Sequence, residues 1–184
     1  GLETDILFNK GIDLPYFSSV TLFASDDNLG VLEDYYRDFL DLARRMGTGL
    51  VLESATWRAS PDWAGPLGLS PDELDRLDGA AVELLTGLRS EYADVPTVIS
   101  GCLGPRGDGY DPGKIMSVTE AEAYHAHQAA VLAAAGIDMF AAITMTNIPE
   151  AVGIANAAKN LGLPVAISFT VETDPSNATA ALVN

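Results

Sequence analysis

The sequence has little cysteine and few basic residues. Its single cysteine among 184 residues cannot form an internal disulfide, which suits a reducing cytoplasm. Only 10 Lys and Arg stand against 26 Asp and Glu, for a formal charge of −16, which argues against nucleic acids and anionic membranes as partners. No apolar run reaches the ~18–20 residues that span a bilayer. The first residues also lack the basic and apolar stretches of a secretory signal.

Segments typical of strands alternate with segments typical of helices along the chain. Apolar runs preceded by Gly or Pro predict four buried strands, within residues 47–57, 95–104, 136–146 and 162–173. Amphipathic spacing and capping residues predict four helices, over residues 28–47, 70–92, 117–136 and 147–162. The alternation predicts an α/β fold with a parallel sheet. Because no flexible linker interrupts it, we expect one domain over residues 1–184.

Polar residues follow the predicted strands, where ligand sites of parallel α/β folds collect. The loops concerned read SATWRASPDW, GCLGPRGDGYDP, TMTN and TVETDPSN, and they suit a small polar ligand. Trp57 comes directly after the first predicted strand and has two interpretations. It walls a pocket for an apolar or cationic ligand, or it covers the core where the loop folds back.

The sparse cysteine and histidine residues give no strong sign of nucleophilic or metal chemistry. Cys102 opens a Gly-rich loop that has neither the P-loop nor the dinucleotide-binding spacing. No histidine in that loop could activate it, which leaves a space-filling residue or a ligand-contacting thiol as interpretations. His125 and His127 lie two apart on a predicted helix and point in directions that diverge by about 200°, so they cannot bind one metal. We interpret both as surface or packing residues.

Four segments in order carry a resemblance to a known family. GLETDILFNKGIDLP resembles an opening strand and loop, with the first residues of the family pattern absent, and VLESATWRAS resembles a Thr-x-Thr-Tyr-x-Ala segment with Trp57 at the Tyr. ISGCLGPRGDGY is similar to a G-S-L-G-P-x-G loop with Cys102 at the Ser, and the H-x-x-Q…L-x-x-A-G-I-D run follows. From Leu2 to about Asp174 the chain resembles the homocysteine S-methyltransferase family, which includes betaine–homocysteine methyltransferase-like enzymes.

The resemblance implies a (β/α)₈ TIM barrel, here incomplete and covering about strands 1–6. It implies transfer of a methyl group from a small donor to the thiol of homocysteine or a related thiol. It also implies a zinc ion held by three cysteines, from Asn-Cys and Gly-Gly-Cys-Cys motifs that are absent here and are expected beyond Asn184. The residues that the resemblance assigns to substrate binding are Glu3, Thr4, Thr56, Trp57, Gly101, Cys102, Thr144 and Glu172.

One position departs from the family pattern in a way that affects the acceptor. Many members have Glu-Thr where this chain has Ile143 and Thr144, and their Glu binds the amino group of homocysteine. Isoleucine cannot pair with an ammonium group. Either another carboxylate, such as Glu3, Glu53 or Glu172, makes that contact, or the acceptor is not homocysteine.

Two other functions stay open at this point. A barrel enzyme of another class, such as a lyase or aldolase, shares the architecture, but such enzymes often need a lysine at a strand end. Lys10, Lys114 and Lys159 all fall in predicted loops or helices. A non-catalytic binding member of the family is the second alternative, and assembly into a homo-oligomer is equally open.

Overall fold

The computed structural model describes residues 1–174 and 179–182, and it contains a parallel sheet of four strands. The strands follow one another in space in the order β1-β2-β3-β4: β1 (Leu50–Glu53), β2 (Thr97–Leu103), β3 (Met139–Met145) and β4 (Val165–Phe169). A doubly wound sheet reverses its strand order at a switch point, whereas a (β/α)₈ barrel keeps sequence order throughout. The order confirms the predicted α/β class and fits an incomplete barrel.

The four predicted helices are confirmed with their ends within about two residues. They are α2 (Asp26–Met46), α4 (Pro71–Glu91), α5 (Val118–Ala135) and α6 (Ile148–Asn160), with a short α3 (Pro61–Ala64) between β1 and α4. Ser70, Ser117 and Asn147 cap their helices by accepting hydrogen bonds from main-chain N–H groups three residues on. Within the described residues, no helix is both long and apolar enough to cross a membrane.

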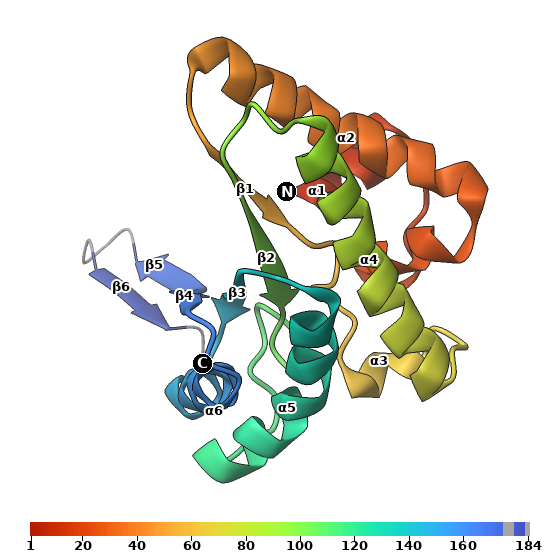
Figure 1. Ribbon diagram of the computed structural model, residues 1–184. Coiled ribbons are helices and arrows are strands. Elements are labelled where there is room, and N and C mark those ends of the chain that lie inside the picture. Colours follow the sequence, from red (N-terminus) through yellow and green to blue (C-terminus); the bar gives the residue numbers. More distant parts are fainter. Residues whose placement is uncertain (175–178, 183–184) are drawn as a thin grey trace.

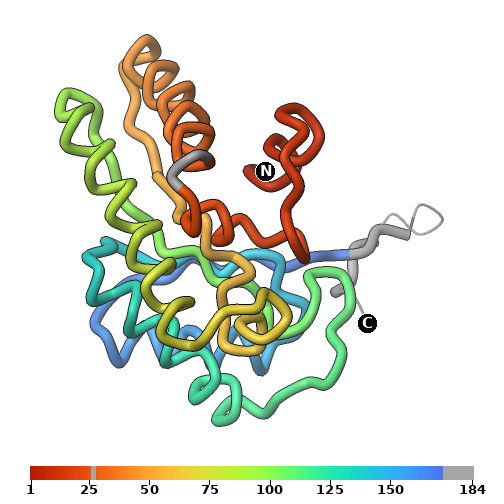
Figure 2. The backbone as a smooth tube through the Cα atoms, turned by 90° about the vertical axis from the view of Figure 1, so that its right-hand side faces the viewer, coloured from red at the N-terminus to blue at the C-terminus, as the bar shows by residue number. Residues whose placement is uncertain are grey.

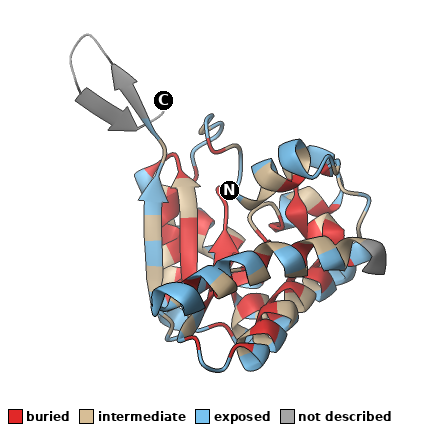
Figure 3. Cartoon of the chain, turned by 90° about the horizontal axis from the view of Figure 1, so that it is seen from above, coloured by how far each residue is buried: buried red, intermediate tan, exposed pale blue. Residues whose placement is uncertain are grey.

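The helices cover one face of the sheet. Helices α4 and α5 pack on β2, and α6 packs on β3 and β4 (Figure 1). Leu52, Ile99 and Phe140 are almost fully buried in this layer, where the buried residues gather in Figure 3. Residues of the alternate register point the other way, and Val51 and Val98 are 54% and 38% exposed. A closed barrel turns that second face inward.

The N-terminal segment differs from the expected opening strand. Residues Leu2–Thr4 form α1, and Asp5–Asn9 continue as a π-helical turn. Local hydrogen bonds hold this segment, such as those from the Asp5 and Lys10 N–H groups to Gly1 and Asp5 carbonyls at 3.1 Å each. Ile6 on this turn is fully buried in the core. The segment therefore satisfies its main chain locally instead of pairing with β1, and the prediction of a strand there is wrong.

The last predicted strand, residues 162–173, is divided in two. Strand β4 ends at Phe169, and β5 (Val171–Asp174) turns away to pair antiparallel with β6 (Thr179–Leu182). The break lies at Thr170, whose N–H donates to the Met145 carbonyl at 2.9 Å. The register of β3 and β4 also shifts between Ala142 and Met145. The described residues thus give four parallel strands where the resemblance led us to expect about six.

Asp78 makes the stability of this fold depend on pH. Asp78 lies on α4 and is 1% exposed. Its Oδ1 has no hydrogen-bond partner among the described residues. Burial, and then the charge of Asp75, raise the pKa of Asp78 well above its usual value. A raised carboxyl pKa stabilises the fold at low pH, and this contribution is lost as the pH rises through the raised value.

The Asp78→Asn variant removes this titration while keeping the side chain's shape. We expect the wild-type free energy of unfolding to fall relative to that of the variant as the pH rises from 5 to 8. Urea denaturation at both pH values measures the difference. A difference between the two proteins that stays constant over this range would show that the pKa of Asp78 in the folded protein is not raised into or above this range.

Candidate functional site at the strand ends

A ring of hydrogen bonds joins the carboxyl ends of β1 and β2. The Cys102 N–H donates to Ser54 Oγ at 2.9 Å, and Thr56 Oγ1 donates to the Cys102 carbonyl at 2.7 Å. Ser54 and Thr56 oxygens lie 2.7 Å apart. Because the Thr56 proton goes to the carbonyl, Ser54 must donate to Thr56, which closes the ring. All three residues are buried, so the ring fixes the two strand ends in a water-excluded place.

Trp57 follows this ring directly and bonds to the end of β3. Its Nε1–H donates to Thr144 Oγ1 at 3.0 Å, which brings together two residues from the predicted site. Thr144 has a φ of 57°, a left-handed conformation that is rare for a β-branched residue. Such strain persists only where the surroundings enforce it, and it is frequent at functional sites. Arg58 also stacks on the Trp57 ring, 4.8 Å from its centroid.

A cavity of about 280 Å³ runs along β1 and reaches these strand ends. Three of the predicted substrate-binding residues, Glu3, Trp57 and Cys102, line it together with Ile143. Sequence reasoning missed three aromatic side chains of its wall, those of Tyr35, Tyr36 and Phe39 on α2. Their spacing marks an apolar helix face and gives no sign that part of this face borders a cavity rather than the core.

Two acidic residues line the cavity. Glu53 lines it, and burial together with the nearby Glu3 raises the pKa of the Glu53 carboxyl. Glu3 accepts a hydrogen bond from Ser19 Oγ at 2.7 Å, which fixes its carboxylate on the N-terminal turn. Two carboxylates beside aromatic rings suit a cationic ligand group.

Cys102 lines the cavity as an unreactive thiol. Its side chain is 2% exposed, and burial, followed by the charges of Glu53 and Glu3, raises its pKa well above the usual value. The thiolate needed for nucleophilic attack or zinc binding is therefore disfavoured at neutral pH. This supports the interpretation of Cys102 as a space-filling residue.

The other predicted site residues lie around the cavity or away from it. Thr56 is buried beneath it with its hydroxyl engaged in the ring, and the Thr4 hydroxyl donates to the Gly1 carbonyl at 2.8 Å. Gly101 faces away from the cavity toward α5, because a Cβ there would lie 3.3 Å from Leu132 Cδ1 on that helix and 2.7 Å from Ile137 Cδ1. Glu172 belongs to β5, but its side chain lies outside the described part of the chain.

The residues present do not fit a zinc site. No group of three His, Cys, Asp or Glu side chains that could hold a metal ion occurs among the described residues. His125 is fully buried beside Glu150, and His127 contacts Asp75 on the surface, so the two histidines face different partners as expected. No zinc-dependent step can be assigned to these side chains.

A second cavity of about 290 Å³ lies between the loop after β2 and the start of α5. Arg106 and Lys114 line it together with the carboxylates of Asp62, Glu120 and Glu150. Arg106 Nε donates to Asp62 at 2.8 Å, so part of its charge is already paired. This mixture of opposite charges selects for no one class of ligand.

Replacing Thr56 by valine tests the hydrogen-bonded ring. The change keeps the shape of the side chain but leaves the buried Cys102 carbonyl and the Ser54 hydroxyl without their partner. We expect a loss of about 1–3 kcal/mol in the free energy of unfolding. Thr86→Val is the matched control, because the Thr86 hydroxyl only bonds back to the Val82 carbonyl within α4. Equal losses in the two variants, measured by urea denaturation, would contradict a special role for the ring.

Comparison with known proteins agrees with this architecture. Three crystal structures of the homocysteine methyltransferase MmuM from Escherichia coli resemble the chain. The metallated form has a TM-score of 0.74 at 23% identity over 93% of this chain, and the oxidized form 0.72 at 24% over 95%. The apo form has a TM-score of 0.62 at 23% identity over 95%. This chain spans 60–62% of the length of those proteins, and the likeness shows a shared fold.

The family model gives the assignment. No curated protein matches the chain in sequence. The model described as homocysteine S-methyltransferase matches residues 1–182, nearly the whole chain. The order of its parallel strands and its incomplete barrel accord with that match. The chain belongs to the homocysteine S-methyltransferase family.

Proposed function

We propose that the protein transfers a methyl group from a small cationic donor to the thiol of homocysteine or a related thiol. The observation that carries the proposal is the cavity that runs along β1 to its carboxyl end, where Glu3, Trp57 and Cys102 line it. Membership of the homocysteine S-methyltransferase family supports the reaction type. MmuM, which shares the fold, is a homocysteine methyltransferase.

The donor and acceptor fit different features of the cavity. A sulfonium or quaternary ammonium donor carries a positive charge that aromatic faces and the nearby carboxylates of Glu3 and Glu53 stabilise. Transfer forms a bond between the acceptor sulfur and the methyl carbon. The methyl bond to the donor heteroatom breaks, its electron pair stays with the donor, and the thiol proton passes to solvent. The apolar side chain of Ile143 offers no partner to a charged group, so the cavity beside it suits an acceptor without a charged end at that point.

Zinc belongs to this proposal through the family resemblance. A metallated form is among the MmuM structures. When bound, zinc lowers the pKa of a coordinated thiol. Since Cys102 is unsuited as a zinc ligand, we propose that the ligand cysteines lie beyond Asn184. We also propose that the protein acts in the reducing cytoplasm. Zinc content and methyl transfer, measured on the protein as its gene encodes it, test this part.

A lyase or aldolase function receives no support from the site. Among the described residues, no lysine lines the cavity at the strand ends. Lys114 lines the second cavity and Lys159 lies on α6, which leaves neither beside Trp57.

Trp57 variants test the site assignment. We expect Trp57→Ala to raise the KM for the methyl donor by tenfold or more, because a cation over an aromatic ring gains up to about 2 kcal/mol when desolvated. Trp57→Phe should restore most of this loss. Trp63→Phe is the control, because Trp63 does not line the cavity. Donor saturation curves for the three variants, with homocysteine as acceptor, measure the effect; an unchanged KM in Trp57→Ala would place the donor elsewhere.

Ile143→Glu tests the choice of acceptor. The variant installs the carboxylate that many family members have at this position. We expect the KM for homocysteine to fall about tenfold relative to that for a thiol without an amino group, since a hydrogen bond to a charged group contributes about 1.5–3 kcal/mol. Equal changes for both thiols would show that position 143 does not face the acceptor's amino group.

A further inference from the structure

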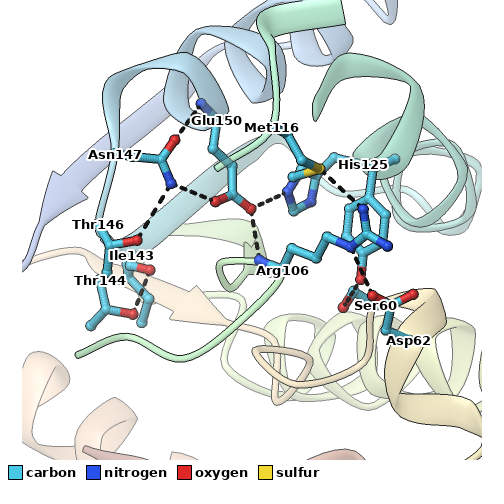
Figure 4. A network of polar contacts seen from close by, with 11 residues as sticks. Ser60, Asp62, Arg106, Met116, His125, Ile143, Thr144, Thr146, Asn147 and Glu150 are labelled. Carbon is cyan, nitrogen blue, oxygen red and sulfur yellow. Dashed lines mark hydrogen bonds and ion pairs between the residues drawn. The ribbon is translucent and has the colours of Figure 1, made fainter. Parts of the chain in front are cut away.

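A buried carboxylate, outside the cavity that Trp57 lines, holds together three segments of the chain. Glu150, in the first turn of α6, is 3% exposed. Its Oε1 accepts from the main-chain N–H of Arg106 at 2.6 Å and from His125 Nε2 at 2.9 Å. Its Oε2 accepts from Asn147 Nδ2 at 3.1 Å (Figure 4). The carboxylate thus joins the loop after β2, helix α5 and the start of α6.

The loop that Glu150 holds also touches the cavity wall. Residues 104–117 connect β2 to α5 as a wide loop (Figure 2). Gly104 lies against Trp57 so closely that a Cβ there would be 2.3 Å from the Trp57 carbonyl oxygen. Gly109 lies against Thr144, the hydrogen-bond partner of Trp57, because its Cβ would lie 3.1 Å from Thr144 Oγ1. The Arg106 N–H lies between these two glycines in the sequence, so Glu150 anchors the loop between its two contacts.

The charge of Glu150 strengthens this anchor. Burial raises the pKa of its carboxyl, but the hydrogen bonds from His125, the Arg106 main chain and Asn147, with the charge of His125, together lower it below the usual value. Glu150 is therefore ionised at neutral pH, and its hydrogen bonds are charge-assisted.

Capping of α6 does not account for this arrangement. Asn147 already caps the helix by accepting from the Glu150 N–H at 2.9 Å. An exposed acid in the first turn would interact equally well with the helix dipole. Neither role requires a fully buried histidine, nor a hydrogen bond to a loop that begins on another strand.

We propose that Glu150 is a positioning residue, which holds the loop after β2 against Trp57 and Thr144 and so sets the wall of the cavity. His125 supports the carboxylate from α5. The effect on the Trp57 environment is independent of the reaction, whereas the effect on methyl-donor binding rests on the proposed function.

Fluorescence of Trp57 tests the positioning directly. The chain has two tryptophans, so a Trp63→Phe background leaves Trp57 as the only reporter. In this background we expect Glu150→Ala to increase acrylamide quenching of Trp57 at least twofold and to shift its emission to the red. Glu150→Gln should give a smaller increase. Its amide oxygen still accepts from Arg106 and His125, and only the hydrogen bond from Asn147 Nδ2 is lost, because an NH₂ group cannot accept it.

Two control variants separate positioning from a loss of stability. Arg106→Ala keeps the main-chain N–H and loses only the side-chain contacts, so quenching of Trp57 should stay near the background value. Asp75→Ala removes the exposed His127–Asp75 pair on the same helix α5 and should also leave it unchanged. Circular dichroism and denaturation curves establish that each variant is folded under the conditions of the measurement.

The outcomes decide the proposal whether or not methyl transfer is observed. A folded Glu150→Ala protein with unchanged quenching would overturn it, as would an Arg106→Ala protein that behaves like Glu150→Ala. If Glu150→Ala does not fold, unchanged quenching in Glu150→Gln overturns it instead.

In an active protein, Glu150→Ala should raise the donor KM at least fivefold with a smaller change in kcat, and Glu150→Gln should recover part of it. Absence of methyl transfer in the wild type would contradict only the proposed function.

Discussion

The hydrogen-bonded ring of Ser54, Thr56 and the main chain of Cys102 determines where the candidate site lies. Parallel strands are held along their length by hydrogen bonds between main-chain groups. Where a strand ends, its main-chain groups need other partners. Here two hydroxyl groups supply the missing partners inside a buried layer. Trp57 follows Thr56 in the chain, so the ring also fixes the point from which its indole reaches Thr144. The cavity is thus a consequence of how β1 and β2 end.

A second polar network acts on the loop that follows β2. The Glu150 carboxylate holds the middle of the loop after β2, while the ring holds the strand from which that loop starts. Between them, Gly104 approaches Trp57 more closely than any side chain would permit, and Gly109 approaches Thr144 where a side chain would be tight. The strained backbone of Thr144 completes this close packing. A rigid wall of this kind suits a site that must hold two small reactants in line.

Periodicity and capping residues predicted the four long helices and the four parallel strands, because they reflect local chemistry. Helix ends such as Ser70 and Gly136 are visible in sequence through their hydrogen-bonding and conformational preferences. The N-terminal segment escaped this reasoning, because nothing in its residues shows that Ile6 packs in the core as part of a helical turn. The site was predicted in part for the same reason: Trp57 follows β1 and Cys102 lies near the end of β2, whereas the pairing of Glu150 with His125 joins two helices. A histidine considered only with its neighbour on one helix gives no sign of a carboxylate 25 residues away.

A crystal structure of the protein with its acceptor thiol bound tests the central claim most directly. Methyl-transfer assays identify that thiol, and soaking or co-crystallisation places it. The account predicts the ligand in the cavity bounded by Trp57, Cys102 and Ile143, with any ammonium group beside Glu3 or Glu53. A ligand bound instead in the cavity beside Arg106 and Lys114 would contradict it.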